Sequence, residues 1–513
     1  MKKPTKPRKP ISQRRAGVIL GYANMLVKNL VNLAYTPMLL AFVGQGDYGV
    51  FEMANSAVYS LSLLSFGFSG AYVRFYTQRA ERHDDAAVRR LNGMYLLLYA
   101  IISLVALAIG LVFSANVELV FSGGLTGDEI VLAGSLMTVM SVNIAVTLFT
   151  NVFNSYITAF ERFSFQQSRQ MLTTLATPLL SLTLLNLGFG VVGVAMAQLT
   201  VNVVLLALNI TYSMRTLGMR FELREHEVGL LKSLTVFSGW LFMNQIMDYL
   251  EINVPSVLLG ALASSTVVAV FAIANKVRSV FISLSTVMSN VFVPKVNQIV
   301  ARNDDNTELT HLMTRVGRYQ GLLLWYVLGG FVVLGQWFIE VWAGPEYADA
   351  YWLIIIMVTP LMVPLAQNVG IEIQRAKNMH KARSMVYLAA ALVNLAFTAA
   401  LAGAFGYWAA AIGYAVTTLV GKGLWMNWYY QCRVGLDMGY YWRRVTPTVL
   451  VVCAAVALCL VGTAFLPVSG ILTFLVWGAL YSCVFGLGAW VFVLTSDERG
   501  KVMGKLRKLA GRA

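Results

Sequence analysis

Residues 91–115 read LNGMYLLLYAIISLVALAIGLVFSA, a stretch of 25 residues without a charged side chain. A helix rises about 1.5 Å per residue, so this stretch is long enough to cross the roughly 30 Å hydrocarbon core of a bilayer. Backbone groups in lipid must bond within the protein, which leaves helices and closed barrels as spanning structures. Barrel strands would be segments of about ten residues with alternating polarity. The stretch therefore predicts a membrane-spanning helix.

Similar apolar runs recur along the whole chain. Of its 513 residues, 58% are hydrophobic and only 12% are charged, whereas soluble proteins carry about a quarter charged residues. The composition predicts an all-α integral membrane protein with about 14 transmembrane helices. We expect these helices near residues 17–42, 49–78, 91–115, 130–157, 168–187, 190–213, 233–260, 267–294, 315–341, 351–374, 383–404, 408–431, 445–466 and 470–494.

The distribution of charge predicts the topology. Lys and Arg account for the net charge of +15 and are concentrated in the N-terminal segment, in the loops after every second helix and in the C-terminal tail. The loops on the opposite side contain no Lys or Arg and carry acidic residues such as Asp128 and Glu346. Because basic loops stay in the cytoplasm, both chain ends are expected there. This placement explains the positive charge without a nucleic-acid partner.

The sequence contains no pattern typical of an enzyme. It has no phosphate-binding glycine loop, nucleophile elbow or metal-ligand cluster, so we expect no catalytic residue, metal or cofactor. The four cysteines lack metal-ligand spacing and are interpreted as packing residues. The basic start from Lys2 to Arg15 precedes an apolar run too long for a cleaved signal peptide, so the first helix is expected to remain as a signal anchor.

The chain also contains an internal repeat. A shift of 220 residues aligns residues 39–85 with residues 259–305 without a gap. The shift matches Asn55 with Asn275 and superposes the Arg-x-Asp-Asp sequence near the end of each segment. It also carries the turn between helices 1 and 2 onto the turn between helices 7 and 8, so each repeat contains six helices. Six is an even number, so both repeats enter the membrane from the same side and are parallel.

The predicted domain organisation follows from this repeat. Two parallel six-helix lobes precede two further helices and a basic tail in which Val502, Leu506 and Leu509 share an apolar face. Such a tail is expected to lie on anionic membrane lipids. The expected segments are a basic cytoplasmic N-terminus at 1–16, an N-lobe at 17–213, a cytoplasmic linker at 214–232, a C-lobe at 233–431, two additional helices within 432–494 and a basic amphipathic cytoplasmic tail at 495–513.

A few cations are predicted to lie inside helices, away from their cytoplasmic ends. Each costs at least about 2.5 to 3.5 kcal/mol at the centre of a membrane helix, so each is expected to face protein or water. Arg74 and Arg375 instead lie at cytoplasmic helix ends, where they are either ordinary interface anchors or part of a cytoplasmic entrance. The deep cations, all candidate substrate-binding residues, are Lys28, Lys276, Arg278 and Lys422.

A polar stripe accompanies the first of these cations. Asn24, Lys28, Asn32 and Tyr35 share one face of the first helix. A lysine paired with a carboxylate for packing is one explanation, but we favour a cavity that this stripe lines. Asn24 and Asn32 are therefore further candidate substrate-binding residues.

Two carboxylates lie at a similar depth in the second lobe. Asp248 and Glu251 share a face of the helix near 233–260, and Lys276 and Arg278 belong to the next helix. Two hypotheses stay open for these charges. They form salt bridges that hold the two helices together, or they couple transport to ions because a carboxylate releases an amine when it is protonated.

Several motifs resemble those of a known family. They are TPMLLAFVGQGDYGVF at 36–51, GFSGAYVRFY at 67–76, AFERFSFQ at 159–166, WAGPEYADAY at 342–351 and AKNMHKAR at 376–383. These motifs resemble segments of the Wzx-type oligosaccharide flippases, in the polysaccharide transporter family of the multidrug/oligosaccharidyl-lipid/polysaccharide (MOP) exporter superfamily. The resemblance spans most of the chain, but the motifs mark helix ends and so indicate the family better than the substrate.

The resemblance implies two six-helix lobes around a central cavity in a bacterial cytoplasmic membrane. It further implies that an undecaprenyl-pyrophosphate-linked oligosaccharide repeat unit moves from the inner to the outer leaflet by alternating access. A proton or sodium gradient is a candidate energy source, with Asp248 and Glu251 as candidate coupling residues. Besides the lipid-linked glycan and anionic lipids, glycan polymerase and assembly proteins are candidate partners.

Three rival functions are considered. A multidrug exporter for organic cations would favour deep carboxylates in the first lobe, where this chain instead carries Lys28. The peptidoglycan lipid II flippase would share the architecture and the cations, but the motifs look closer to the polysaccharide branch. A scaffold for glycan assembly predicts that Lys28 or Lys276 can be replaced by Ala without loss of glycan export.

Overall fold

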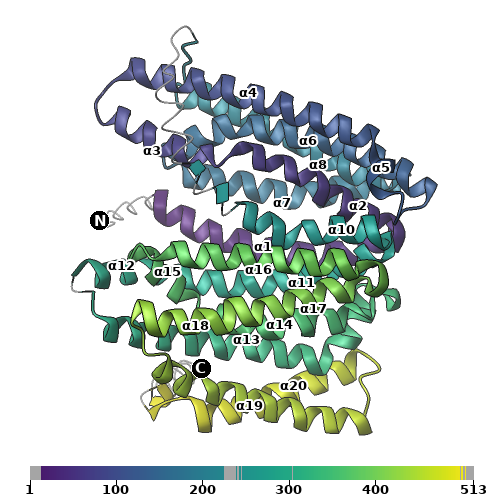
Figure 1. Cartoon of the computed structure of the whole chain (residues 1–513), viewed down its shortest axis with the longest axis vertical. Coiled ribbons are helices and arrows are strands. Elements are labelled where there is room, and N and C mark those ends of the chain that lie inside the picture. The colour runs from purple at the N-terminus through teal and green to yellow at the C-terminus, as the bar shows by residue number, and fades with distance from the viewer. Residues whose placement is uncertain are drawn as a thin grey trace, which may run out of the picture. The chain divides into compact units, whose positions relative to one another are not determined.

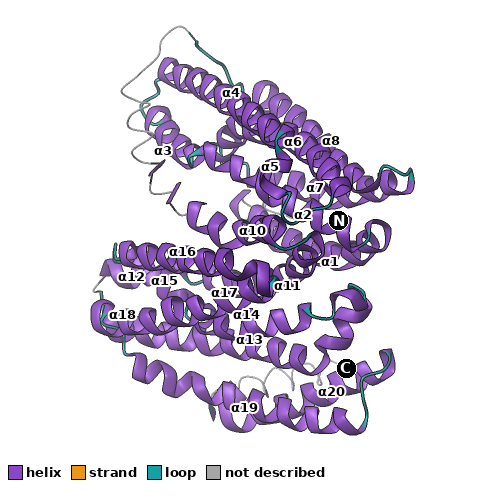
Figure 2. Ribbon diagram, turned by 45° about the vertical axis from the view of Figure 1, so that its right-hand side comes forward, coloured by secondary structure: helices purple, strands orange, loops and turns teal. Residues whose placement is uncertain are grey.

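The computed structural model describes residues 13–223, 238–239, 242–243, 245–302, 304–496, 498–500 and 503. All regular structure in these ranges is helical, and Figure 2 shows the helices joined by loops. The prediction of an all-α protein is therefore confirmed. The chain forms two compact units, Met1–Ala269 and Val270–Ala513, which we call the N-unit and the C-unit (Figure 1).

The N-unit is built around one central helix. Its helices are α1 (Gln13–Val43), α2 (Gln45–Tyr59), η1 (Ser60–Ser65), α3 (Phe68–Ala80), α4 (Asp85–Ala115), α5 (Val117–Phe121), α6 (Gly127–Ala159), α7 (Phe163–Asn186), α8 (Gly190–Thr211), η2 (Tyr212–Thr216) and α10 (Val254–Leu262). Helix α6 packs against α2, α3, α4 and α8, while α1 packs against α7. Both ribbon views show α4 and α6 running side by side (Figures 1 and 2).

The C-unit contains the longest helix of the described chain, α13. Its helices are α11 (Ser265–Asn290, which begins in the N-unit), α12 (Val293–Arg302), α13 (Asn306–Trp342), η3 (Pro345–Tyr347), α14 (Ala350–Ala366), α15 (Asn368–Ala376), α16 (His380–Phe405), α17 (Tyr407–Thr417), η4 (Thr418–Trp425), α18 (Met426–Tyr429), η5 (Tyr430–Val434), α19 (Met438–Phe465), α20 (Ile471–Gly488) and η6 (Ala489–Val493). Helix α13 packs against α14 and α19, and α19 packs against α20.

Eleven segments in the described ranges are long and apolar enough to cross a membrane, which confirms a multi-pass membrane protein. Each coincides with one of the predicted helices. Of the three other predicted helices, the one at 168–187 is present as α7, and the one at 408–431 lies within the helical residues 407–434. The third, at 233–260, falls partly outside the described residues, and its described part is helical at 245–252 and in α10.

The predicted segments at the chain ends and between the lobes are described only in part. The N-terminus at 1–16 is described from residue 13, and the tail at 495–513 is described at six positions. The linker at 214–232 is described only as far as residue 223. The boundaries of the predicted segments therefore stay predictions.

Two predicted helices are interrupted. The helix expected at 49–78 is divided into α2, η1 and α3, because Phe66 and Gly67 adopt left-handed φ angles of 51° and 71°. Glycine tolerates this conformation because it lacks a Cβ atom. The break was not predicted, because a single left-handed turn leaves the hydrophobic pattern of the sequence unchanged. The helix expected at 267–294 likewise ends at Asn290, just before α12.

The helix expected at 351–374 consists of two helices, α14 and α15. Where they meet, the carbonyl oxygens of Leu365 and Ala366 accept hydrogen bonds from the hydroxyl groups of Ser285 and Tyr441, at 2.7 and 3.0 Å. Lipid supplies no hydrogen bonds, so an interruption at membrane depth requires such protein partners.

The repeated Arg-x-Asp-Asp sequence precedes a long helix in both units, but the capping aspartate is the first of the pair in one unit and the second in the other. The Asp84 carboxylate accepts a hydrogen bond from the backbone N–H of Ala87 at 2.8 Å and begins α4. The Asp305 carboxylate accepts one from Thr307 at 2.7 Å and begins α13. Each aspartate thus caps the N-terminus of the next long helix.

Helices α4 and α6 approach each other closely at Gly110. A Cβ atom at this position would lie only 2.6 Å from the Cβ atom of Ser141. Small residues permit such close backbone approach between membrane helices.

We expect Gly110→Ala to destabilise the N-unit. The added methyl group overlaps Ser141, and overpacking of this kind costs about 1 to 3 kcal/mol. The matched control is Gly486→Ala in α20, where a Cβ atom meets nothing within 4 Å. Thermal unfolding of the purified protein in detergent should show a lower midpoint for Gly110→Ala only. Equal midpoints for the two variants would be inconsistent with this packing.

Candidate functional site

A polar cavity of about 330 Å³ lies within the N-unit. Helix α1 contributes Lys28, Asn32 and Tyr35, so three of the four residues of the predicted stripe line one space. The other walls are α7 and α8, which contribute Gln170, Thr173, Thr174, Thr177, Pro178, Gln198 and Asn202. We call this cavity, defined by these ten residues, the N-unit polar pocket.

Lys28 is the only cationic residue among those that line the N-unit polar pocket. Its side chain is exposed, and it has no ion-pair partner in the described part of the chain. The Tyr35 hydroxyl is buried without a hydrogen-bond partner among the same described residues. Asn202 donates to Asn143 of α6 at 2.7 Å, which orients the far wall. The ammonium group of Lys28 is therefore surrounded by amides and hydroxyls that can solvate it or a bound ligand.

Asn24 lies beside this pocket rather than in its lining. Its side chain is buried and donates to Gln167 of α7, and its oxygen accepts from Thr174, each at 3.4 Å. These contacts join α1 to α7 one turn away from Lys28. Asn24 thus supports the wall of the pocket, while Asn32 faces the pocket itself.

Three cations gather around two tyrosine rings in the C-unit. The Arg278 guanidinium lies 4.4 Å from the ring centre of Tyr414, and the Lys422 ammonium lies 5.5 Å from the same ring. Lys422 also lies 5.0 Å from the ring of Tyr387, which Arg383 approaches at 5.3 Å. We call Arg278, Arg383, Lys422, Tyr387 and Tyr414 the C-unit cation cluster.

The C-unit cation cluster is buried. Arg278, Lys422 and Arg383 are 3%, 7% and 9% exposed. Within the described residues, neither Arg278 nor Arg383 has a carboxylate partner, and the Nε atom of each is buried without a hydrogen bond. An aromatic face contributes about 2 kcal/mol or more to a desolvated cation, less than the cost of removing the charge from water. The arrangement is therefore suited to binding an anion.

The local sequence around Lys422 permits this close packing. Lys422 lies in the π-helix η4 between Gly421 and Gly423. A Cβ atom at Gly421 would lie 3.4 Å from the Cβ atom of Ala390 of α16, about an ordinary van der Waals distance, so η4 packs directly against that helix. π-helical turns are rare and often occur at functional sites.

The other predicted site residues are not among the residues that define these two groups. Lys276 is half-buried on α11, two positions before Arg278, so the two side chains leave the helix in nearly opposite directions. In the N-unit, Asp248 is exposed and Glu251 is half-buried. Because these carboxylates and the α11 cations belong to different units, their pairing stays a hypothesis.

The two residues predicted for a cytoplasmic entrance also lie in different units. Arg74 is exposed on α3. Arg375, at the end of α15, forms an ion pair with Glu372 at 2.6 Å. The Arg375 side chain is 58% exposed and that of Glu372 is 15% exposed, so the pair contributes little to stability, and a role of Arg375 at an entrance stays a prediction.

Two features of these groups were missed by the sequence analysis. Arg383 was expected at the cytoplasmic start of the helix at 383–404 and was not counted among the deep cations. It lies in the first turn of α16, four residues before Tyr387, a spacing that signals contact on one helix face. The polar residues of α7 and α8 were not recognised either. Gln198 and Asn202 share one helix face, and the same test that identified the stripe on α1 would have found them.

The fold is similar to that of solved MOP-superfamily transporters. The structure of the lipid II flippase MurJ in an inward closed conformation aligns with a TM-score of 0.74 and 12% sequence identity, over 93% of this chain and 98% of that chain. An inward-facing multidrug resistance MATE family transporter of the MOP superfamily aligns with a TM-score of 0.63 and 16% identity, over 81% of this chain and 98% of that chain. At sequence identities this low, the similarity shows a shared fold and nothing about a shared substrate.

The sequence itself matches one family. No curated protein sequence matches the chain. The sequence model of the family described as "Polysaccharide biosynthesis protein" matches residues 38–352, which is more than half of the chain. The resemblance to polysaccharide transporters is thereby confirmed at the level of the family, and the chain belongs to the polysaccharide biosynthesis protein family, with the fold of a MOP-superfamily membrane transporter.

Proposed function

We propose that this protein is a flippase for an undecaprenyl-pyrophosphate-linked oligosaccharide repeat unit. It transfers the headgroup from the inner to the outer leaflet of a bacterial cytoplasmic membrane by alternating access, while the lipid tail stays in the bilayer. Family membership supports a lipid-linked glycan as the substrate class. The observation that carries the proposal is Lys28, a cation without a carboxylate partner in the described chain, within a pocket of amides and hydroxyls.

The chemistry of the N-unit polar pocket matches both parts of such a headgroup. A pyrophosphate is anionic and requires a cation or strong hydrogen-bond donors in place of water. Sugars present many hydroxyl groups, which pair with amide and hydroxyl side chains such as Gln170, Thr173 and Asn202. An organic cation, as in the rival multidrug function, would be repelled by Lys28.

The C-unit cation cluster supplies a second group of positive charges. Arg278, Arg383 and Lys422 repel one another in a buried environment, and an anion would relieve this repulsion. We therefore assign pyrophosphate binding to Lys28 in the N-unit and to this cluster in the C-unit. Lys276 is assigned a weaker, more peripheral contribution.

The proposed topology has fourteen crossings. Three further segments complete the count: α7, the helical residues 245–252 together with α10, and residues 407–434. With this number, and with Lys and Arg confined to alternate loops, both chain ends lie in the cytoplasm.

Replacement of Lys28 by Ala should reduce glycan export at least about tenfold. A hydrogen bond to a charged group contributes about 1.5 to 3 kcal/mol, and 1.4 kcal/mol is a factor of ten. Lys28→Arg retains the charge and should restore most of the export. Surface glycan would be measured in the source strain lacking its own copy, at matched protein abundance.

The control for the charge change is Lys295→Ala, since Lys295 is half-exposed and pairs with Glu308 at 3.4 Å outside the N-unit polar pocket. Export by this variant should match that of the wild type. Undiminished export by Lys28→Ala would refute the transport role of Lys28 and favour the scaffold hypothesis. If the protein rescues a strain depleted of its lipid II flippase, the lipid II rival is favoured. If its deletion sensitises cells to cationic dyes without loss of surface glycan, the multidrug rival is favoured.

The tyrosine rings provide a separate test of the C-unit cation cluster. Tyr414→Leu removes the ring that faces Arg278 and Lys422 and should lower both the unfolding midpoint and glycan export. Tyr414→Phe is the matched control, because it keeps the ring and removes only a hydroxyl that is buried without a hydrogen-bond partner in the described chain. Equal loss in the two variants would argue against a role for the ring face.

Asp248 and Glu251 are proposed to couple flipping to a proton or sodium gradient. Flipping in vesicles should slow when one of the two gradients is collapsed, and Asp248→Asn or Glu251→Gln should remove that dependence. Glu118→Gln, at an exposed position of α5, serves as the control. Flipping that responds to neither gradient would leave these carboxylates with the structural role of neutralising cations.

A further inference from the structure

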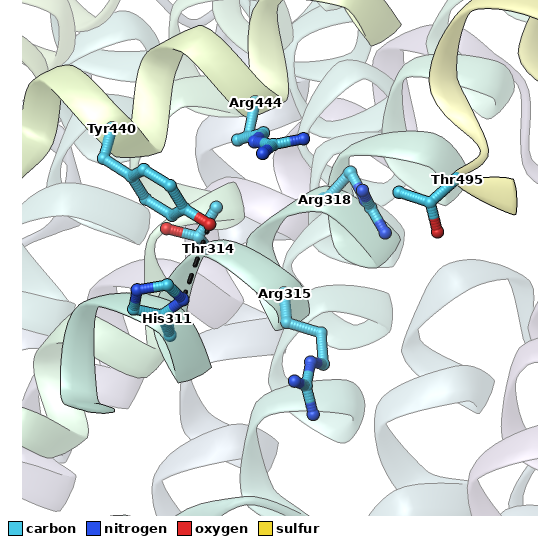
Figure 3. A pocket seen from close by; sticks show the side chains of 7 residues that line it. All are labelled: His311, Thr314, Arg315, Arg318, Tyr440, Arg444 and Thr495. Atoms are coloured by element: carbon cyan, nitrogen blue, oxygen red, sulfur yellow. Dashed lines mark hydrogen bonds between the residues drawn. The ribbon is translucent and has the colours of Figure 1, made fainter. Parts of the chain in front are cut away.

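A second polar cavity, of about 200 Å³, lies within the C-unit (Figure 3). It is formed where three helix ends meet. His311, Thr314, Arg315 and Arg318 come from the first turns of α13, Tyr440 and Arg444 come from the first turns of α19, and Thr495 follows η6. None of these residues belongs to the C-unit cation cluster.

The cavity is strongly basic. Arg318 forms an ion pair with Glu498, which also accepts hydrogen bonds from the Tyr319 hydroxyl at 2.7 Å and the Thr495 N–H at 3.0 Å. Burial by itself would raise the pKa of Glu498, but the bonds from Tyr319 and Thr495 outweigh it and lower the pKa, so this carboxylate is ionised. In the described chain, Arg315 and Arg444 have no carboxylate partner. Both side chains are exposed, and Arg444 also lies 5.7 Å from the ring centre of Tyr440, so within the described residues their charge has no carboxylate counter-charge.

The cavity also contains hydrogen-bond donors that have no partner. The Thr314 hydroxyl is buried without a hydrogen bond to any described residue, and Thr314 is only 4% exposed. The Nε atom of Arg318 is likewise buried without a hydrogen bond to any described residue. Tyr440 and His311 are hydrogen-bonded to each other at 3.4 Å and close one side (Figure 3). Buried donors without a partner among the described residues, beside two guanidinium groups without a described carboxylate partner, favour an acceptor with negative charge.

The depth of the cavity points to the source of that acceptor. The 21 residues 319–339 of α13 are uncharged, and Arg318 comes directly before them. The 21 residues 445–465 of α19 are uncharged as well, and Arg444 comes directly before them. Each stretch is about 31 Å long as a helix, the thickness of a hydrocarbon core. Both arginines therefore lie at the level of the lipid headgroups.

We propose that this cavity binds a phosphate group, and that its occupant is the headgroup of an anionic phospholipid. Arg315 and Arg444 hold the phosphate, with Thr314 and Arg318 as further donors. The bound lipid joins α13 to α19, the helix that begins the additional pair, and so fastens that pair to the rest of the C-unit. This inference concerns a structural lipid, and it does not depend on the proposed transport substrate.

The test compares two variants that make the same type of change. Arg315→Gln/Arg444→Gln removes the two uncompensated charges, while Arg443→Gln removes the neighbouring exposed arginine of α19, which does not line the cavity. Unfolding midpoints would be measured in detergent with cardiolipin, phosphatidylglycerol, phosphatidylcholine or inorganic phosphate. We expect the two anionic lipids, but not phosphatidylcholine, to raise the midpoint of the wild type and of Arg443→Gln. The double variant should bind these lipids about thirtyfold more weakly, since each basic residue contributes about 1 kcal/mol.

The outcomes separate the possible phosphate sources. If inorganic phosphate raises the unfolding midpoint as much as the anionic lipids do, the cavity is a phosphate site, but its occupant is a soluble phosphate and not a lipid. An identical response of the wild type, the control and the double variant would overturn the proposal. If the double variant does not fold, a cardiolipin with a photoreactive headgroup tests the wild type directly. Crosslinks should map to residues 311–318 and 440–444, and their absence there would also overturn the proposal.

Discussion

A charge inside a bilayer persists only where something replaces the water that it loses. This constraint governs both groups of deep cations in the molecule. In the N-unit the replacement is a polar pocket, where amides and hydroxyls surround Lys28. In the C-unit it is a pair of aromatic faces, on which Arg278, Arg383 and Lys422 lie. Among the described residues, no carboxylate partners Lys28, Arg278 or Arg383, which is why we propose an anionic ligand for these groups.

The same constraint applies to the backbone. Where α14 ends and α15 begins, carbonyl groups lose their helical partners, and Ser285 and Tyr441 supply hydrogen bonds in their place. Gln320 in turn donates to the Ser285 carbonyl at 3.0 Å and to the Ser289 hydroxyl at 2.7 Å. The interruption is therefore held by a buried polar network, which allows a change of helix direction at membrane depth without exposing backbone groups to lipid.

Hydrophobic run lengths predicted the position of nearly every helix, because lipid imposes a minimum length on each. The cost of placing a charge in lipid led to the prediction that Lys28, Lys276, Arg278 and Lys422 face protein or water. Arg278 and Lys422 are buried, and Lys28 lines the N-unit polar pocket; the binding roles of all four stay predictions. The breaks could not be predicted, since the left-handed turn at Phe66 depends on local backbone geometry that hydropathy does not report. Arg383 was missed because it comes near the start of a helix, where sequence cannot distinguish an arginine that reaches water from one that turns back onto a tyrosine ring.

The polar face of α7 has a consequence for how the protein is made. Helix α7 is not among the eleven segments that are apolar enough to span a membrane, because the glutamines and threonines that line the N-unit polar pocket lower its hydropathy. Such a segment does not partition into lipid efficiently on its own. It requires a neighbour that covers its polar side, and α1, which packs along it, has already been synthesised when α7 emerges. We therefore expect the insertion of α7 to depend on α1 being present in the membrane, so the residues that line the pocket also bear on membrane assembly.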